Sequence, residues 1–242
     1  LHVRSRRQRQ MCIRDSNPRD KRLRSSIMIS WNDIRYIVDC GPDFRQQMLR
    51  ENIQSINGVL FTHEHADHTA GIDDLRPYTY KMGEVPIYAQ ERVIENLKVR
   101  FSYIFETENR YAGAPKLTEN TIDSTSFILH GVQVTPLAVM HGNLPITGYR
   151  FGNVAYITDL KTMSDQEKKK LENLEILIVN ALRIDAHPTH LNLEEALAFV
   201  NEIKPKRAYF THISHKLGFH EDVEKILPEN VFLSYDGLQI TL

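Results

Sequence analysis

Residues 61–68 of this 242-residue chain read FTHEHADH, which places three histidines and two carboxylates within six consecutive positions. In an extended segment, the side chains of His63 and His65 leave on the same side. Asp67 and His68 follow at an expected strand-to-helix turn, where the backbone can direct them elsewhere. The pattern can therefore serve two neighbouring metal ions, and its nitrogen and oxygen donors suit Zn, Mn or Fe. The alternative is a solvated polar turn of chance composition.

Strand-like apolar runs alternate with helical segments along the chain. The expected strands cover residues 27–31, 34–39, 58–62, 85–89, 128–130, 132–136, 146–151, 154–158, 176–181, 207–211, 231–234 and 239–242. The expected helices cover residues 44–52, 71–82, 91–101, 164–174 and 193–203. Many strands, with helices in both halves, predict an α/β (α+β) fold in which two sheets and their covering helices form a four-layer αββα sandwich.

The composition is that of an ordinary globular protein, with 41% hydrophobic and 25% charged residues. No apolar run approaches the roughly 18 residues of a membrane span, and nothing resembles a secretory signal. The two cysteines, Cys12 and Cys40, cannot form a disulfide framework. We therefore expect a cytoplasmic protein without a membrane partner. Cys40 stands at an expected strand end, and we expect it to be packed rather than ligating.

Charge is distributed unevenly along the chain. Residues 1–28 carry nine Lys/Arg against two Asp, a charge of +7, so the remainder must carry −8 to give the net charge of −1. A basic arm of this kind can bind nucleic acid. However, residues 1–16 show neither alternation nor helical period, and the run RQRQMCIRDS resembles a translated sequencing adapter. We expect residues 1–16 to be a non-native or disordered segment and residues 17–242 to form a single domain.

Three later segments, AVMHGN, YITDL and YFTHIS, join the first motif in making the chain resemble a metallo-β-lactamase-fold hydrolase over residues 27–242. That family carries a His, an Asp and a His after strands in its second half. The resemblance implies two divalent metal ions, Zn or Mn, in each chain. By resemblance, the first ion would be held by His63, His65 and His141, the second by Asp67, His68 and His212, and Asp159 would bridge both.

The ligand set implied by the resemblance also suits an anionic substrate. Two divalent ions, reduced by Asp67, Asp159 and one bridging hydroxide, leave a centre of about +1, matched to a phosphodiester. Asp67 would thus serve the reaction as well as the second metal. Glu64 lies between the first two histidines, and we expect it to face solvent or to support the ligands rather than to bind metal.

The segment HPTHLNLEEALAFV at residues 187–200 places two histidines just before a helix. This arrangement resembles the phosphodiesterase and ribonuclease Z branch, in which such a histidine donates a proton to the leaving oxygen. His190 fits this role best, because Asn192 then stands at the expected N-cap of the helix. General-acid catalysis of this type increases the reaction rate on the order of 10²–10⁴-fold. We expect His187 to be an ordinary surface histidine.

The nearest likeness is to phosphoribosyl 1,2-cyclic phosphate phosphodiesterases of the carbon–phosphorus lyase pathway. It depends on the segments NPRDKRLRSS, DCGPDFRQQ, HADHTAGIDDLRP and SHKLGFHEDVEKILPENVFLSYDGL. That group holds a structural zinc with an N-terminal Cys-rich loop and a His three residues after the last catalytic ligand. His215 occupies this position, but only Cys12 lies upstream of the fold, so we expect a remnant rather than an intact structural zinc site.

Two cations are candidates for phosphate contact, Arg76 in DDLRPY and Arg183 in NALR. The neighbouring carboxylates Asp73 and Asp74 are expected to orient the ligand loop, because metal-bound imidazoles usually donate their second N–H to a neighbour.

These features predict a dinuclear metal-dependent phosphodiesterase that hydrolyses a small, cyclic or open, phosphodiester through a metal-bridging hydroxide. One alternative is a ribonuclease Z-like endonuclease that processes tRNA 3′ ends. Such an enzyme needs a basic exosite for folded RNA, and the acidic body shows no Lys/Arg-rich insertion, which disfavours nucleic acid as a partner. A second alternative is a metal-binding protein without hydrolytic activity. A homodimer is left open.

Overall fold

The computed structural model describes residues 17–108 and 110–242, and the chain divides into two compact units. The N-terminal unit is Arg24–Pro136, and the C-terminal unit combines residues 17–23 with residues 137–242. Strand β7 (Val132–His141) runs from the first unit into the second. The segment 1–16 and Cys12, for which we expect no part in the fold, lie outside the described residues.

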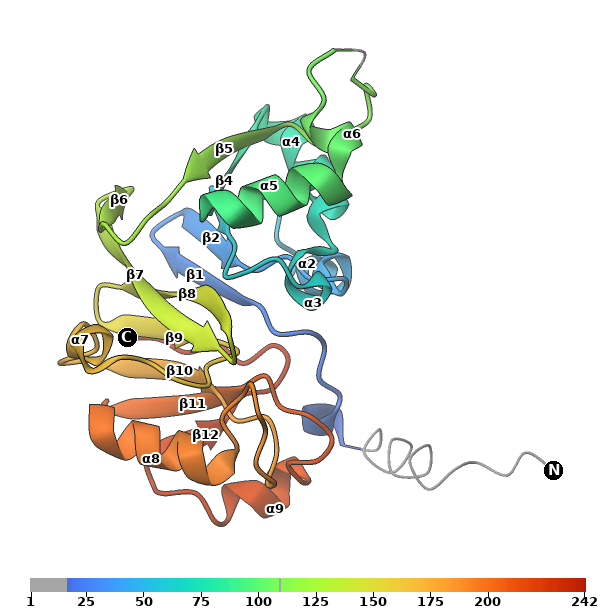
Figure 1. Ribbon diagram of the computed structural model, residues 1–242. Helices are drawn as coiled ribbons and strands as arrows, with labels where there is room; N and C mark the ends of the chain where they lie inside the picture. The colour runs from blue at the N-terminus through green and yellow to red at the C-terminus, as the bar shows by residue number, and fades with distance from the viewer. Residues whose placement is uncertain (1–16, 109) are drawn as a thin grey trace. The chain divides into compact units, whose positions relative to one another are not determined.

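The N-terminal unit contains a five-stranded sheet in the order β1-β2-β3-β4-β5 (Figure 1). Strands β1 and β2 form an antiparallel hairpin, and β2 to β5 are parallel. Its elements are β1 (Ile27–Trp31), β2 (Ile34–Val38), α2 (Phe44–Arg50), β3 (Gly58–Leu60), α3 (Ala66–Thr69), η2 (Ile72–Leu75), α4 (Arg76–Met82), β4 (Val85–Ala89), α5 (Glu91–Arg100), α6 (Ser102–Phe105), β5 (Leu117–Thr121) and β6 (Phe127–Leu129).

One apolar core joins this sheet to its helices. Ile37, Val59 and Ile87, from three adjacent strands, belong to the same buried cluster as side chains of α2, α4, α5 and α6. In α5 the apolar residues recur at helical spacing, so one face of the helix is buried and the other is charged. Cys40 is buried in this cluster, which confirms that it is packed.

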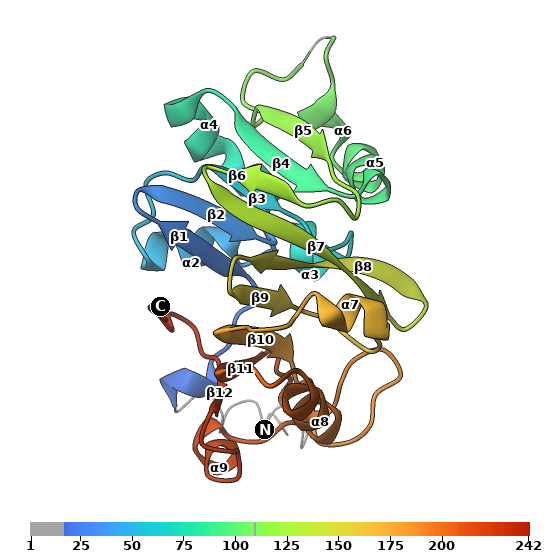
Figure 2. The same cartoon turned by 90° about the vertical axis from the view of Figure 1, so that its left-hand side faces the viewer.

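The C-terminal unit contains strands β8 to β12, with β9, β10, β11 and β12 parallel and β8 antiparallel to β9 (Figure 2). Every residue of β10 is buried, as predicted for a strand covered on both faces. The further elements are η1 (Pro18–Asp20), β8 (Leu144–Phe151), β9 (Val154–Ile157), α7 (Asp165–Lys169), β10 (Ile176–Asn180), α8 (Leu193–Ile203), β11 (Arg207–Thr211), α9 (His220–Glu224) and β12 (Val231–Leu233).

Helix α8 begins where the sequence predicted. The Asn192 side chain accepts a hydrogen bond from the Glu195 backbone, and the Glu195 side chain accepts one from the Asn192 backbone, which completes a capping box. The apolar face of α8 packs on β10 and β11 in the core of this unit.

The expected elements differ from the structure in several places, among them the following three. The helix expected over residues 71–82 divides into η2, which ends at Leu75, and α4, which begins at Arg76, since Pro77 has no backbone N–H and is accommodated in the first turn of a helix. Strand β5 was not expected because its sequence, LTENT, lacks an apolar alternation. The strand expected at residues 239–242 was wrong, and that segment is irregular. Among residues 17–108 and 110–242, no helix has the length and apolar character needed to cross a membrane.

Residues 17–23 fasten to the end of the C-terminal unit around His220. The Asp20 carboxylate accepts the His220 backbone N–H at 2.8 Å, and the Arg22 guanidinium lies 2.9 Å from the His220 Nδ1 atom. Arg22 also donates to the backbone carbonyl of Ser234 at 3.0 Å. His220 itself is buried. These contacts anchor the first seven residues of the segment NPRDKRLRSS, on which the family resemblance partly depends, to the C-terminal unit.

Acidification is expected to destabilise the protein through His220. Burial lowers the pKa of this histidine, and the Arg22 guanidinium acts in the same direction. The unfolded chain then binds a proton more readily, so the free energy of unfolding decreases as pH falls through about 6.5. Urea unfolding at about pH 7.5 and about pH 5.5 tests this, because His220→Gln should lose less stability over that interval than wild type. Equal losses would contradict the prediction.

Candidate metal centre

Metal-ligating side chains gather into two groups, one in each unit, at the carboxyl ends of strands. The N-terminal ligand group consists of His63, His65, Asp67 and His68, which follow β3. The C-terminal ligand group consists of His141, Asp159, His190 and His212, of which His141 ends β7 and Asp159 and His212 follow β9 and β11. In each unit the parallel strands bring their carboxyl ends to one edge, the usual place for ligands in such sheets.

The N-terminal ligand group is compact. The His63 Nε2 atom lies 2.9 Å from the His65 Nδ1 atom, and the ring centroids of His63 and His68 are 4.3 Å apart. The Asp67 Oδ2 atom is 3.5 Å from the His68 Nε2 atom. The four side chains predicted from the sequence are thus gathered in one place within this unit.

A buried carboxylate, Asp39, orients the histidines of this group. Its Oδ2 atom accepts the Nδ1–H of His68 at 2.7 Å, and its Oδ1 atom accepts the backbone N–H of Thr62 at 2.8 Å. Burial raises the pKa of Asp39, whereas the hydrogen bonds from His68 and Thr62 act to lower it. Asp39 directly follows β2, and the parallel pairing of β2 with β3 brings it beside the ligand loop.

The Asp39 contacts also determine where the imidazole protons lie. The Thr62 hydroxyl has a single hydrogen, which it donates to Asp39 at 2.8 Å, so its oxygen accepts from the Nδ1–H of His63 at 2.9 Å. His63 and His68 therefore carry their protons on Nδ1 and present an unprotonated Nε2. This is the form in which imidazole binds a metal ion.

Sequence reasoning assigned the orienting role to Asp73 and Asp74, and for Asp73 this is corrected. The Asp73 carboxylate accepts hydrogen bonds from Arg76 at 2.7 and 2.8 Å and from Tyr103 at 2.8 Å. Asp39 carries no local signal of its role, because the contact with His68 spans 29 residues and depends on strand pairing.

The Asp39→Asn variant is expected to bind divalent metal roughly 10–100-fold more weakly, since the amide no longer holds His68 and Thr62 in place. Asparagine also tolerates the left-handed backbone that Asp39 adopts, with φ 66°. Chelator competition with zinc measures the affinity, and Asp73→Asn is the matched control, which should keep wild-type affinity. Equal affinity of the two variants would contradict the assigned role of Asp39.

The C-terminal ligand group centres on Asp159. Its Oδ1 atom lies 2.8 Å from the Nε2 atom of His190 and 3.4 Å from that of His212. The His190 ring stacks on His212 at 5.0 Å and meets His141 edge-on at 4.5 Å. Ligand atoms of His141, Asp159 and His190 lie within 4.8 Å of one another.

The backbone around Asp159 is held by side chains of this unit. The Asn180 amide, at the end of β10, accepts the Leu160 N–H at 2.6 Å and donates to the Leu160 carbonyl at 3.2 Å. Thr158 donates its hydroxyl to the Asp159 carboxylate at 2.6 Å. Both Asp159 and His212 adopt left-handed backbone conformations, with φ of 55° and 52°.

His190 lies beside Asp159 and His187 in the C-terminal unit. It is buried, and burial lowers its pKa while the Asp159 carboxylate acts to raise it. His187, which was expected to be an ordinary surface histidine, is half-buried, and its Nδ1 atom lies 3.1 Å from that of His190. Burial lowers the pKa of His187 as well.

The remaining predicted residues have partners of other kinds. Arg76 binds Asp73, and Arg183 donates to the backbone carbonyls of a neighbouring loop, at residues 185 and 186. Glu64 forms an ion pair with Arg92 of α5, as expected for a supporting residue. His215 is exposed. Phosphate contact by the two arginines and the structural-metal role of His215 remain predictions.

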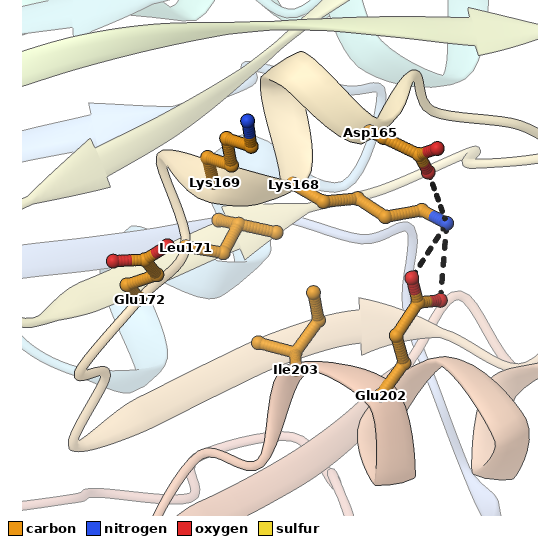
Figure 3. Close-up of a pocket in the computed structure, with 7 residues that line it drawn as sticks. All are labelled: Asp165, Lys168, Lys169, Leu171, Glu172, Glu202 and Ile203. Carbon is orange, nitrogen blue, oxygen red and sulfur yellow. Dashed lines mark hydrogen bonds and ion pairs between the residues drawn. The ribbon is translucent and has the colours of Figure 1, made fainter.

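A pocket of about 240 Å³ lies beside α7 and α8 in the C-terminal unit (Figure 3). It is lined by Asp165, Lys168, Lys169, Leu171, Glu172, Glu202 and Ile203. Lys168 forms ion pairs with Asp165 at 3.3 Å and with Glu202 at 2.8 Å, so its charge is already matched. The pocket contains no predicted site residue.

The donors of both groups fit divalent metal ions. Imidazole nitrogens and carboxylate oxygens are the ligands that Zn, Mn and Fe accept, and the orienting contacts of Asp39 resemble those found around bound metals in general.

Comparison with known proteins agrees with this chemistry. The model of the beta-lactamase superfamily domain matches residues 34–213. A crystal structure of a new diphosphatase from the PhnP family is 38% identical, covers 94% of this chain and 87% of its own, and superposes with a TM-score of 0.87.

Curated relatives include an acyltransferase and a ribonuclease. An octanoyltransferase of Porphyromonas gingivalis is 38% identical over 230 residues, which are 93% of this chain but only 46% of that protein. The chain thus spans less than half the length of this relative. A ribonuclease Z of Borreliella afzelii is 23% identical, with 93% of both chains covered.

Proposed function

Because the chain belongs to the beta-lactamase superfamily and, within it, to the PhnP family, we propose that it is a dinuclear metal-dependent hydrolase of small phosphodiesters. The chain has the metallo-β-lactamase fold, mixed α/β with two sheets, and this superfamily consists largely of metal-dependent hydrolases. The observation that carries the proposal is the N-terminal ligand group, in which Asp39 holds His68 directly and His63 through Thr62, with Nε2 of both rings left unprotonated.

In the proposed enzyme the two ligand groups together hold two divalent ions. The first would be bound by His63, His65 and His141, the second by Asp67, His68 and His212, with Asp159 shared between them. When bound, such ions lower the pKa of water and neutralise charge on the phosphoryl oxygens. The two units would then form one catalytic domain, which agrees with a single family model that spans both.

His190 is proposed to protonate the leaving oxygen. Its Nδ1 atom faces Thr189 and His187, so Nε2 is the atom available for proton transfer. The ring is largely shielded from solvent. Asp39 and Thr62 would hold the ligand loop still while the ester is bound.

A small phosphodiester is the preferred substrate class, since a centre of positive charge suits an anion and the acidic body does not favour a long polyanion. The similarity to ribonuclease Z supports a second candidate, cleavage of precursor tRNA. The octanoyltransferase similarity covers less than half of that protein, and acyl transfer is not part of the proposal.

Metal analysis combined with a substrate panel tests the proposal. The panel comprises bis(4-nitrophenyl) phosphate, a 1,2-cyclic ribose phosphate, a nucleoside diphosphate and a precursor tRNA. We expect two equivalents of metal per chain and hydrolysis of the small diesters that a chelator abolishes and added Zn or Mn restores. Preferential cleavage of the tRNA would favour the second candidate, whereas bound metal without any hydrolysis would indicate a binding protein.

A further inference from the structure

We infer that Thr189 is a positioning residue that orients two histidines of the C-terminal ligand group at once. Its backbone carbonyl serves His141, and its side-chain hydroxyl serves His190. The inference rests on the proposed function, because it assigns to His141 a metal and to His190 a proton transfer. No motif pointed to Thr189, since a threonine between a proline and a histidine has no signature of its own.

The carbonyl of Thr189 determines the tautomer of His141. The Nδ1 atom of His141 lies 2.8 Å from this oxygen, and a carbonyl can only accept, so Nδ1 carries the proton. The Nε2 atom of His141 is then unprotonated and able to bind a metal ion. This contact reproduces for His141 what Asp39 and Thr62 provide for His63 and His68 in the other unit.

The hydroxyl of Thr189 lies between two imidazoles. The backbone N–H of Thr189 is 3.3 Å from the Nδ1 atom of His187, which must therefore be an acceptor. The Thr189 hydroxyl lies 3.3 Å from the same atom and 2.9 Å from the Nδ1 atom of His190. The Nε2 atom of His190 lies 2.8 Å from a carboxylate oxygen of Asp159, which can only accept, so Nε2 carries a proton. In the neutral ring of His190 the Nδ1 atom is then an acceptor, and the Thr189 hydroxyl donates to it.

This contact leaves the Nε2 proton of His190 as the one that can be transferred. The Nε2 atom lies 2.8 Å from Asp159, at the centre of the C-terminal ligand group. If the hydroxyl were absent, the His190 ring could turn or shift its proton, and Nε2 would no longer be held toward the reacting ester.

The surroundings of Thr189 keep it in place. A Cβ atom added to Gly142 would lie 2.8 Å from the Thr189 methyl group, so the glycine after β7 leaves the room that Thr189 fills. Gly142 also has a φ of 62°, which favours glycine. On the other side, the backbone N–H of Leu191 donates to the Leu160 carbonyl at 2.8 Å. The loop before α8 is thereby fastened next to Asp159.

The test uses Thr189→Val and Thr189→Ser in the full chain. Valine keeps the shape and the backbone carbonyl but removes the hydroxyl, whereas serine keeps both oxygen atoms. The first readout is the imidazole ¹⁵N shifts of metal-free protein, which report where each ring proton lies. We expect the His190 signals to shift in Thr189→Val and to return in Thr189→Ser, while those of His141 stay as in wild type. Unchanged His190 signals in Thr189→Val would overturn the inference.

The second readout is kinetic. For a diester with a phenyl leaving group, which needs a proton, we expect kcat of Thr189→Val to fall roughly 10–100-fold with little change in KM. The loss should be smaller for 4-nitrophenyl esters, and Thr189→Ser should recover most of the activity. An equal loss for both leaving groups, or a loss of bound metal, would overturn the role. If wild type hydrolyses no diester, the proposed function fails, and the ¹⁵N shifts alone decide for or against Thr189.

Discussion

Asp159→Asn is expected to lose diesterase activity by more than about 100-fold, together with part of its bound metal. Mutation of a group that only orients a metal ligand lowers metal affinity or activity roughly 10–100-fold. Asp159 is proposed to bind both ions itself, so its loss should cost more. The substitution removes one negative charge and one metal-binding oxygen but keeps the size of the side chain. Asparagine also accommodates the left-handed backbone at this position, so the chain should still fold.

The measurement combines metal content, kcat/KM for a small diester and thermal unfolding with and without zinc. For wild type, zinc at about 100 times its Kd adds about 2.7 kcal/mol to the free energy of unfolding. Asp159→Asn should gain much less, although without metal it should unfold near the wild-type temperature. Asp165→Asn, an exposed residue of α7, is the matched control and should keep metal, activity and stability. Full metal content and activity in Asp159→Asn would refute the shared-ligand role.

His190→Gln is expected to lower kcat on the order of 10²–10⁴-fold without loss of metal, because it removes the proton donor while filling similar space. The effect should depend on the leaving group. A 4-nitrophenolate leaves without a proton, whereas a phenolate or an alkoxide needs one, so the loss should grow from 4-nitrophenyl to phenyl diesters.

Two other results with His190→Gln would change the role assigned to His190. Its Nε2 atom lies close to the donor atoms of His141 and Asp159, so a loss of bound metal in His190→Gln would make it a ligand instead. Unchanged rates for every ester would contradict a catalytic role altogether. His215→Gln changes an exposed histidine of the same unit and should leave both metal and kcat at wild-type values.

The elements that sequence analysis predicted correctly are those with a strong local signal. Strand β10 is a continuous apolar run, and α8 combines helical spacing with an N-cap at Asn192. The strand before His63 was evident from its apolar run followed by a polar cluster. In each case neighbouring residues carry the information, so no knowledge of distant pairing was needed.

What was missed depends on contacts between distant segments. Asp39 acquires its role only when Val38 and Leu60 pair in the parallel register of β2 and β3. Strand β5 is largely polar and gains its order from pairing with β4. The contacts of Thr189 with His187 and His190 likewise depend on the loop that folds before α8. None of these contacts leaves a periodic pattern in the residues that make them.

Asp39, Asp159 and His212 adopt left-handed backbone conformations directly after three strands. At these positions the residue that suits the backbone best is not the residue that the proposed site needs. Each such residue is strained by on the order of 1 kcal/mol relative to glycine. Selection for thermal stability alone would therefore favour glycine at these three positions, whereas selection for catalytic activity would retain Asp and His. Attempts to produce a hardier version of this protein should begin away from those three turns.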